Sequence, residues 1–498
     1  MQILTVETVS LGDRSYIVSD GTTAAVIDPQ RDLDRILALL DDHGLQLAAV
    51  LETHLHNDYV SGGLELAART GARYHLHAEE RTDFAFSPLR DGAVVQVGAI
   101  TLRALLTPGH TPTHLSYVAA EGGRDLAVFT GGSLLYGSVG RTDLIAADRT
   151  EELTRLQHRS ARRIAAELAD EVDVRPTHGF GSFCSSGETS GAFTSTVGRE
   201  RRGNQALTLA DEDAFVEVLI AGLDHYPAYY AHMAPLNRRG PAPVDLSPPE
   251  RIDPAEAVRG VQAGQWLVDL RPRSDFAAAH LAGSINIELA DNASTYLGWL
   301  IPWGTPVSLL ADNAEDVAAM QRQLVRIGID RPAGQASEGL DGLDGLGGSG
   351  PRQAYEVSDF AGLRRALDDG AEPVVLDTRR NLEWRDGHLP MAVHIPLHQL
   401  QDRLEELPAG EVWVHCATGY RAAIAASLLA RAGREVVLID DLFDGTAVAF
   451  TDGSPPVATG RHRPGDCGTE RPGGQGHPRV AAHVSGHSTT RCSHLPIP

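Results

Sequence analysis

Over residues 1 to about 205, short runs of apolar and β-branched residues alternate with longer amphipathic segments. Runs typical of strands lie at 3–9, 15–20, 24–29, 47–53, 94–105, 115–120 and 126–132. Residues 31–44 and 150–169 instead repeat apolar positions every three to four residues, which predicts helices, and Gly44 is placed to end the first of them. Strands in pairs with helices between them predict an α/β sandwich of mixed sheets covered by helices.

The pattern changes after residue 205. Residues 206–237 have a helical pattern that ends in the aromatic run Tyr226, Tyr229 and Tyr230. The stretch RRGPAPVDLSPPE that follows is rich in proline and glycine, which exclude regular structure. We therefore assign residues 1–205 to a first domain and residues 206–250 to a helical extension and linker.

Two segments after residue 250 resemble each other. Each has a buried strand that ends in aspartate, a polar loop, a His-Leu pair, and then a second buried strand, a loop and a helix. This internal duplication predicts two α/β domains with parallel sheets flanked by helices, at residues 251–335 and 355–458. The glycine-rich residues 336–354 predict a flexible linker, and residues 459–498 predict a disordered tail.

Charge and cysteine content narrow the class of protein. A formal net charge of −23 argues against a nucleic-acid-binding surface. We find neither a signal peptide nor a run of about 18 apolar residues, so we expect no membrane contact. Four cysteines are too few for a disulfide framework in a chain of 498 residues, which favours a cytoplasmic location with free thiols. We read Cys184 as a small loop residue and assign no role to Cys467 and Cys492.

Histidines and an aspartate gather at three predicted strand ends. They lie in the motifs THLHND, TPGHTPTH and PTHGFG. Alternating residues at a strand–loop junction can converge on one point, and imidazoles with a carboxylate bind divalent metal ions. The predicted metal-site residues are His54, His56, Asp58, His110 and His178.

These motifs resemble the metallo-β-lactamase superfamily, whose pattern is H-x-H-x-D-H followed by later histidines and an acidic residue. The resemblance implies an αββα sandwich and a supporting role for Asp28. TPGHTPTHLSY and LYGSVGRTDL look most like persulfide dioxygenases, which oxidise glutathione persulfide to sulfite at one iron; the glyoxalase II hydrolases are near relatives. Arg141 and Asp143, in GRTD, are expected either to orient an anionic thiol substrate or to form a structural ion pair.

Two positions depart from the superfamily pattern. Tyr59 replaces the last histidine of the motif, and Gly132 stands where the later acidic residue is expected. A two-metal site relies on both residues, so a binuclear hydrolase is not expected. Of the iron ligands in persulfide dioxygenases, only His54 and His110 carry over.

A mononuclear site of three histidines remains available. His54, His56 and His110 would leave positions open for a persulfide sulfur and O₂, with Asp58 and His178 as weak ligands or as partners of the ligands. We expect one divalent metal ion, iron(II) in preference to zinc.

Cys416 lies between a buried strand, VWVH, and a helix that begins near Arg421. Backbone N–H groups at a helix N-terminus and a nearby arginine favour thiolate over thiol, and thiolate is the reactive nucleophile. Four residues separate the cysteine from the arginine, one fewer than in tyrosine-phosphatase-like loops, so the tighter ring suits sulfur carried on cysteine. We predict Cys416 and Arg421 as catalytic residues and Gly419 as part of the substrate-binding loop.

This segment resembles the rhodaneses, whose upstream signature matches Asp377, Glu383, Gly387 and His388. The resemblance implies that Asp377 and His388 support the loop. The upstream copy matches the same signature through Asp269, Arg271, His280 and Gly283, but Ala311 falls where the cysteine is expected. Without a thiol, that copy is predicted to be an inactive spacer or docking domain.

Three functions are compatible with these motifs. The first is oxidation of a low-molecular-weight thiol persulfide by O₂ at the metal, coupled to sulfur transfer through Cys416 with thiosulfate or sulfite as further substrates. The second is thioester hydrolysis resembling glyoxalase II, with a metal-bound hydroxide as nucleophile. The third is a sulfur carrier whose metal domain only binds. The sequence leaves homo-oligomerisation open.

Overall fold

The computed structural model describes residues 1–186, 192–340 and 351–443. The predicted glycine-rich linker lies partly outside the described residues, and the predicted tail with Cys467 and Cys492 lies wholly outside them. All described residues belong to one compact unit, Met1–Val457.

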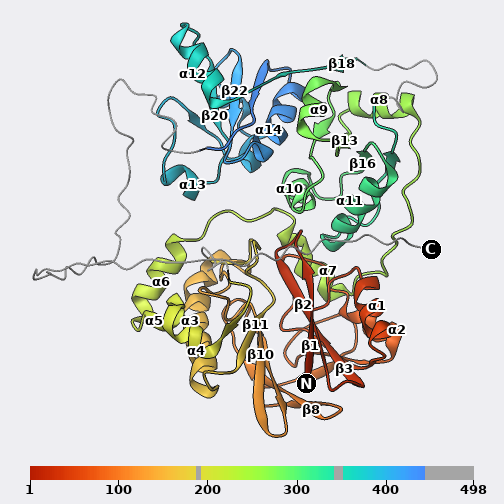
Figure 1. Ribbon diagram of the computed structural model, residues 1–498, viewed down its shortest axis with the longest axis vertical. Coiled ribbons are helices and arrows are strands. Elements are labelled where there is room, and N and C mark those ends of the chain that lie inside the picture. The colour runs from red at the N-terminus through yellow and green to blue at the C-terminus, as the bar shows by residue number, and fades with distance from the viewer. Residues whose placement is uncertain (187–191, 341–350, 444–498) are drawn as a thin grey trace, which may run out of the picture. The chain divides into compact units, whose positions relative to one another are not determined.

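Two six-stranded sheets face each other in the N-terminal part of the chain (Figure 1). The first, in spatial order, contains β1 (Gln2–Thr8), β2 (Asp13–Ser19), β3 (Thr23–Ile27), β4 (Gln46–Leu51), β5 (Arg73–His77) and β6 (Ser87–Leu89). The second contains β12 (Ser195–Thr196), β11 (Asp173–Pro176), β10 (Arg124–Gly131), β9 (Leu115–Glu121), β8 (Ile100–Leu106) and β7 (Val94–Val97). Successive side chains of a strand face opposite ways, so alternate residues of both sheets form one buried apolar layer. It includes Tyr16, Ile27, Leu51, Tyr117 and Phe129.

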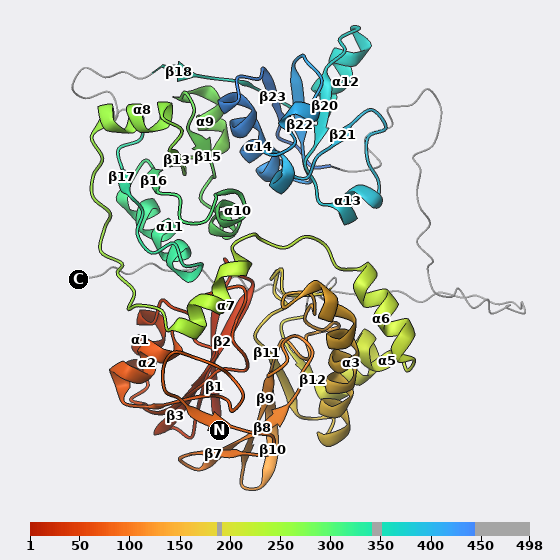
Figure 2. The same ribbon diagram turned by 180° about the vertical axis from the view of Figure 1, so that it is seen from behind.

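Helices cover the outer faces of the two sheets (Figure 2). The helices on the first sheet are α1 (Asp34–Asp42) and α2 (Gly63–Thr70), and α3 (Thr150–Glu167) lies on the second. The apolar stripe of α3, with Leu153, Ala161 and Ile164 buried, repeats at helical spacing and packs against that sheet. The expected αββα sandwich is therefore confirmed.

One predicted strand is a hairpin. Residues 94–105 form β7 and β8, which pair antiparallel around Gly98. Gly98 has a φ of 56°, a left-handed conformation that glycine adopts without steric cost, so the chain reverses there. Apolar alternation continues across such a turn, which is why the pattern reads as one strand.

The helical extension is divided into shorter pieces than the pattern predicts. They are α5 (Gln205–Thr208), α6 (Glu212–Ala221) and α7 (Tyr230–Arg239), and α4 (Val197–Gly203) lies at the end of the predicted first domain. Tyr230 begins α7, so the aromatic run precedes a helix and does not end one. Residues 240–249, within the predicted linker, contain no helix or strand.

Two parallel sheets follow, each flanked by helices. The first, in spatial order, contains β15 (Ile285–Asn286), β13 (Trp266–Asp269), β16 (Val307–Leu310) and β17 (Gly334–Ala336). The second contains β21 (Val393–His394), β20 (Val374–Asp377), β22 (Val412–His415), β23 (Val436–Ile439) and β19 (Glu356–Ser358). In the first sheet β13 pairs with β15 and β16, and β16 pairs with β17. In the second sheet β20 pairs in the same way with β21 and β22, and β22 pairs with β23. Apart from β19, the two sheets therefore have the same strand order.

The remaining elements connect or cover these sheets. The short strands β14 (His280–Leu281) and β18 (Arg352–Gln353) pair antiparallel. The helices are α8 (Pro254–Gln262), α9 (Arg273–Ala278), α10 (Ala293–Leu300), α11 (Ala314–Arg326), α12 (Phe360–Asp368), α13 (Asn381–Arg385) and α14 (Tyr420–Arg431).

A buried ion pair joins the sandwich to the first parallel-sheet domain. Arg326, in α11, donates to both carboxylate oxygens of Asp32 at 3.0 and 2.7 Å and to the Ser10 hydroxyl at 2.8 Å. The backbone N–H of Val60 donates to the Arg326 carbonyl oxygen at 2.7 Å. Breaking such a buried pair would leave an uncompensated charge, so this contact stabilises the packing of the two domains against each other.

Candidate metal centre and thiol site

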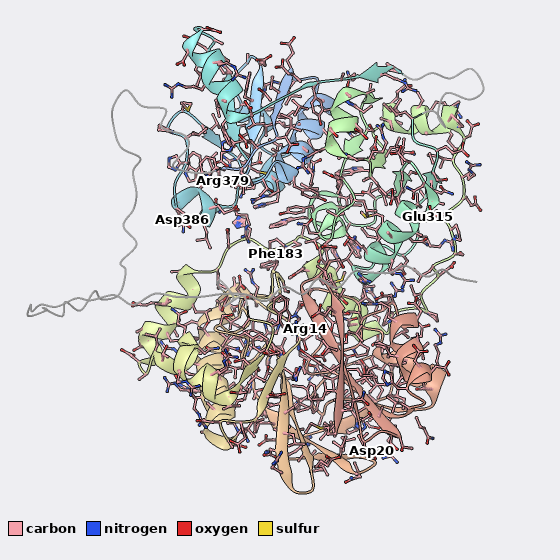
Figure 3. All side chains as sticks on the ribbon, in the orientation of Figure 1. Arg14, Asp20, Phe183, Glu315, Arg379 and Asp386 are labelled. Atoms are coloured by element: carbon pink, nitrogen blue, oxygen red, sulfur yellow. The ribbon has the colours of Figure 1, made fainter. Side chains whose placement is uncertain are left out.

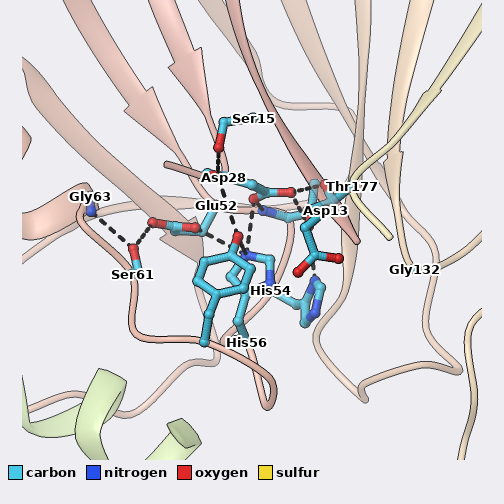
Figure 4. A network of polar contacts seen from close by, with 12 residues as sticks. Asp13, Ser15, Asp28, Glu52, His54, His56, Ser61, Gly63, Gly132 and Thr177 are labelled. Atoms are coloured by element: carbon cyan, nitrogen blue, oxygen red, sulfur yellow. Dashed lines mark hydrogen bonds and ion pairs between the residues drawn. The ribbon is translucent and has the colours of Figure 1, made fainter. Parts of the chain in front are cut away.

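The predicted metal-site residues gather at strand ends of the sandwich and are all buried. His54 and His56 follow β4, His110 follows β8, and His178 follows β11. Figure 4 shows His54 and His56 within a network of polar side chains that also holds Asp13 and Asp28. The ends of two facing sheets thus bring together residues that are far apart in the sequence.

The tautomer of His54 is fixed by its neighbour. The Thr53 hydroxyl donates to Asp28 Oδ2 at 2.8 Å, so its oxygen can only accept from His54 Nδ1, which lies 2.9 Å away. Asp28 remains ionised, because burial, which raises its pKa, is outweighed by His56, Thr177 and the Thr53 backbone, and its pKa is lowered. With Nδ1 carrying the proton, the Nε2 of His54 has a free lone pair.

His110 and His178 are oriented in the same way. His110 Nδ1 lies 2.7 Å from the Arg141 carbonyl oxygen, which only accepts, so Nδ1 donates and Nε2 carries the lone pair. His178 Nδ1 lies 2.9 Å from Asp13 Oδ1 and 3.1 Å from Asp58 Oδ2. Oriented imidazoles that donate their second N–H to a carboxylate or a carbonyl are typical of metal ligands.

The three ring nitrogens that remain face one another. The ligand atoms of His54, His110 and His178 all lie within 4.8 Å of each other, and the Nε2 atoms of His54 and His178 are 3.4 Å apart. His110 Nε2 is buried without a hydrogen-bond partner among the described residues. Buried polar atoms normally have partners, so the orphaned nitrogen and the converging lone pairs fit a divalent metal ion.

Burial and mutual repulsion keep two of these imidazoles neutral. Burial and the neighbouring histidines lower the pKa of His54 far below its ordinary value, and burial with His178 lowers that of His110 to about 3. Burial also acts to lower the pKa of His178, but Asp58 and Asp13 outweigh it, and its pKa is raised. Neutral imidazole is the form that binds a metal, so a metal ion competes here only with the His178 proton.

His56, also predicted as a metal-site residue, has two carboxylates and a hydroxyl around its Nε2. Its Nε2 lies 3.2 Å from Glu52 Oε2, 3.3 Å from Asp28 Oδ1 and 2.9 Å from the Tyr59 hydroxyl. Burial acts to lower the pKa of His56, yet Asp28 and Glu52 raise it to about 9. Among the described residues, His56 could share a metal with Asp58 and His178 or with Asp28 and Glu52, but the group of His54, His56 and His110 does not form.

Gly132 explains why no carboxylate belongs at its position in this chain. A Cβ atom on Gly132 would collide with the ring of His110. The N–H of Gly132 instead donates to His114 Nε2 at 3.1 Å. His114, to which the sequence analysis assigned no role, stacks on His54 with 4.9 Å between ring centroids and so supports that ring.

Arg141 and Asp143 form a tight pair beside the metal site. Arg141 Nε and Nη2 each lie 2.7 Å from a carboxylate oxygen of Asp143, and its other N–H groups donate to the carbonyl oxygens of Phe183 and Asp224. The guanidinium of Arg141 is therefore hydrogen-bonded to acceptors of the protein. Its backbone carbonyl oxygen accepts from Nδ1 of His110 and so orients that ring.

The predicted thiol site lies at the end of β22. Cys416 is 1% exposed and is followed by a short loop to Gly419, the residue before α14. Gly419 has a φ of 84°, and a Cβ there would meet the side chain of Asp440, so glycine adopts this turn without backbone strain or a side-chain collision. No side chain caps the N-terminus of α14, which leaves its first N–H groups beside the loop.

Arg421 is held in place by a second pair. Its two terminal nitrogens bind the Glu383 carboxylate at 2.6 and 2.7 Å. Burial acts to raise the pKa of Glu383, but Arg421 outweighs it and lowers that pKa to about 2. The positive charge of Arg421 thus stays near the loop in a fixed orientation.

The two predicted supporting residues differ in position. Asp377 is fully buried, and its carboxylate binds Arg379 through both the side chain and the backbone N–H. His388 is exposed and stacks on Trp384 with 3.6 Å between ring centroids. Asp377 orders the strand end beside the loop, whereas His388 packs on the surface.

Several residues of the site were not predicted. Asp13, Thr53 and Glu52 contact the histidines directly, and the Thr177 hydroxyl donates to Asp28. Glu52 and Thr53 directly precede the motif HLHND, which is the one sequence signal that could have found them. Asp13 and Thr177 have no such signal, because their role depends on a contact between the two sheets, where the Arg14 N–H at the start of β2 donates to the carbonyl oxygen of Thr177, just after β11, at 2.8 Å.

Cys184 lies near the metal site but is fully buried. Its Sγ is 3.9 Å from the Tyr230 hydroxyl. Burial, Asp58 and Asp13 raise the pKa of the thiol far above its ordinary value, so it stays protonated.

Among the described helices, none is long and apolar enough to cross a membrane.

Comparisons with known proteins agree with this architecture. The model of the metallo-beta-lactamase superfamily matches residues 13–173, and that of the rhodanese-like domain matches residues 360–445. A crystal structure of a metallo-beta-lactamase from Staphylococcus aureus subsp. aureus COL is 26% identical with a TM-score of 0.61, covering 67% of this chain and 98% of that one.

Two curated relatives match part of the chain. A hydroxyacylglutathione hydrolase of Rhodopseudomonas palustris (strain ATCC BAA-98 / CGA009) is 37% identical over 131 residues, which are 25% of this chain and 49% of that protein. The chain thus spans about half the length of this relative. Protein ML0493 of Mycobacterium leprae (strain TN) is 30% identical over 221 residues, which are 39% of this chain and 92% of that protein. The chain therefore belongs to the metallo-beta-lactamase superfamily through residues 13–173 and carries a rhodanese-like domain at residues 360–445.

Proposed function

We propose that this protein is a sulfane-sulfur enzyme that oxidises a low-molecular-weight thiol persulfide at a mononuclear metal centre and transfers sulfur through Cys416. The observation that carries the proposal is the convergence of three oriented imidazoles in a buried site on the same chain as a cysteine in a rhodanese-like loop. Both centres suit small sulfur compounds, and their fusion raises the local concentration of whatever they exchange.

The metal would be held by His54, His110 and His178. A divalent iron in such a site supplies open positions for a persulfide sulfur and for O₂. The chain contributes orientation: Thr53 fixes His54, the Arg141 carbonyl oxygen fixes His110, and Asp13 and Asp58 hold His178. Burial excludes bulk water, which protects a reactive sulfur species from side reactions.

The thiol centre would carry sulfur as a Cys416 persulfide. The Cys416 thiolate attacks the outer sulfur of thiosulfate, a new S–S bond forms to Cys416, the S–S bond of thiosulfate breaks, and sulfite leaves with the electron pair. A thiolate acceptor then attacks the outer sulfur of the persulfide and releases the Cys416 thiolate. The N–H groups at the start of α14 and the Arg421 guanidinium stabilise the negative charge in both states.

Elemental analysis and oxygen uptake test the metal centre together. Protein purified without added metal should contain about one iron per chain and consume O₂ with glutathione persulfide. His110→Ala should lose both, whereas His77→Ala, which changes a histidine within β5, should keep both. Iron-loaded protein that consumes no O₂ would refute the dioxygenase activity.

A thioester hydrolase is the second candidate. A second group of possible ligands, His56, Asp58 and His178, shares a residue with the first, and one relative is a hydroxyacylglutathione hydrolase. This function would require zinc or two metal ions per chain and activity without O₂. Hydrolysis of S-lactoylglutathione under anaerobic conditions would favour it over the dioxygenase.

A further inference from the structure

A cavity of about 470 Å³ lies between the metal-binding domain and the two parallel-sheet domains. We call it the chamber. Phe183 lines it from the metal-binding domain and Asp386 from the domain that contains Cys416, and both are labelled in Figure 3. Asn292 and Tyr296, at the start of α10, line it from the domain without a cysteine. The volume is that of a typical small-molecule site.

One wall of the chamber backs directly onto the metal centre. Arg141 lines the chamber, and its carbonyl oxygen accepts the Nδ1 proton of His110. Gly12 also lines it and immediately precedes Asp13, the partner of His178. A single layer of residues therefore separates the chamber from two of the proposed ligands.

The opposite wall reaches the thiol loop. Tyr296, Arg380 and Arg421 line both the chamber and a smaller adjoining pocket. Thr378 also lines that pocket, and its hydroxyl donates to the carbonyl oxygen of His415, the residue before Cys416. The chamber thus adjoins the supporting residues of both centres.

The chamber wall carries charges of both signs. Arg421 binds the Glu383 carboxylate through both terminal nitrogens, whereas the Arg380 side chain reaches that carboxylate only through Nε at 3.4 Å and is 41% exposed. Asp224 and Asp386 supply negative charge on the same wall. Separated positive and negative groups complement a zwitterion better than a polyanion, because like charges on a wall repel the ligand.

We propose that the chamber binds the thiol carrier for both centres, and that this carrier is a zwitterionic amino-acid or peptide thiol. The inference rests on the proposed function, since it assigns one carrier to its two reactions. The carboxylate of the carrier would bind Arg380, and its amine would face Asp224 or Asp386. The domain without a cysteine then has a defined role, because α10 closes the chamber.

Binding of an unreactive carrier analogue tests the chamber without relying on activity. The probe is S-methylglutathione, titrated calorimetrically into the full-length Cys416→Ser protein, with coenzyme A as a polyanionic comparison. We expect one site per chain for S-methylglutathione and no binding of coenzyme A. Arg380→Ala and Asn292→Trp should each weaken binding at least about tenfold, the loss expected for one charged contact or a filled site.

A matched variant separates the chamber from general damage. Val357→Trp introduces the same bulky side chain at a position that is 43% exposed and distant in sequence from the chamber residues, and it should leave binding unchanged. In the protein with Cys416 intact, S-methylglutathione should inhibit persulfide-dependent O₂ uptake and thiosulfate–cyanide sulfur transfer with the same inhibition constant. Unchanged binding in both chamber variants, or inhibition of only one working reaction, would overturn the shared chamber.

Failure of the proposed function gives a different pattern. If the protein consumes no O₂, calorimetry and inhibition of sulfur transfer still decide the inference. Binding that is lost in Arg380→Ala and inhibits sulfur transfer would support a chamber that faces Cys416. Binding without such inhibition would contradict it.

Discussion

Each of the two parallel-sheet domains has a buried strand followed by a loop and a helix, but the two loops differ. In the first, β16 is followed by Ala311, and the side chain of Asn313 accepts the N–H of Asp316 at 2.9 Å at the start of α11. In the second, β22 is followed by Cys416, and Gly419 leaves the start of α14 without a side-chain cap. In the first domain a side chain caps the N-terminus of the helix, whereas in the second the N-terminus has no side-chain cap and its N–H groups are available to a ligand.

The comparison teaches that loss of a thiol is only half of the difference. A helix N-terminus attracts an anion only while its N–H groups are unoccupied. In the first domain the Asn313 side chain already accepts one of these N–H groups. A cysteine at position 311 would therefore lie beside a capped helix N-terminus. The sheets are equivalent in strand order, and the chemistry is decided by a few loop residues.

Removing the thiol should have the largest effect. Cys416→Ser should lower thiosulfate sulfurtransferase activity at least about 1,000-fold, because a hydroxyl cannot carry the sulfur. Cyanide-dependent thiocyanate formation measures this, and metal content should not change. Retained activity would refute the assignment of Cys416.

Adding a polar side chain at the start of the second helix should have the next largest effect. Asparagine tolerates a positive φ better than most residues, so Gly419→Asn places an amide beside the uncapped N-terminus of α14. The added side chain competes for the N–H groups and meets Asp440, so we expect about a 100-fold lower kcat. If the rate is unchanged while circular dichroism shows a folded protein, the uncapped helix has no catalytic role.

The ion pair of Arg421 should contribute less. Glu383→Gln replaces the bidentate ion pair with one hydrogen bond from the Arg421 guanidinium to a neutral amide oxygen, and it should lower kcat about tenfold at pH 7. The folded-state pKa of Glu383 is lowered from 4.5 to about 2, so its stabilisation is complete above pH about 4.5 and is lost as pH falls towards 2.

Denaturant unfolding at several pH values checks the sign of this effect. Wild-type protein should exceed Glu383→Gln in stability at neutral pH, and the difference should shrink between pH about 4.5 and 2. A difference that grows on acidification would contradict the paired state of Glu383.

The cap of the first domain should affect stability alone. Asn313→Ala removes one capping hydrogen bond and should lower the free energy of unfolding by about 1 kcal/mol. Sulfurtransferase activity should remain within experimental error of wild type. A clear fall in activity would show that α11 communicates with Cys416.

The sequence predicted those features that depend on local patterns. Strand and helix periodicity predicted an α/β sandwich of mixed sheets covered by helices, and the motif THLHND placed His54 and His56 at the end of β4. The hairpin at Gly98 was predicted as a single strand, because apolar alternation does not change at a tight turn.

Other features depend on contacts that no local pattern encodes. His56 turns towards Glu52, Asp28 and Tyr59, because two buried carboxylates attract a protonated imidazole more strongly than neutral histidines do. Whether His178 is a direct ligand, as we propose, depends on its separation from His54, which only the folded chain sets. The chamber likewise arises from three domains and could not be read from any one of them.

The close packing of Gly132 against His110 limits what one substitution at position 132 can do. A Cβ atom there would collide with the His110 ring, so aspartate could not occupy this position unless that imidazole moved. A carboxylate at position 132 would therefore require a second change that repositions His110.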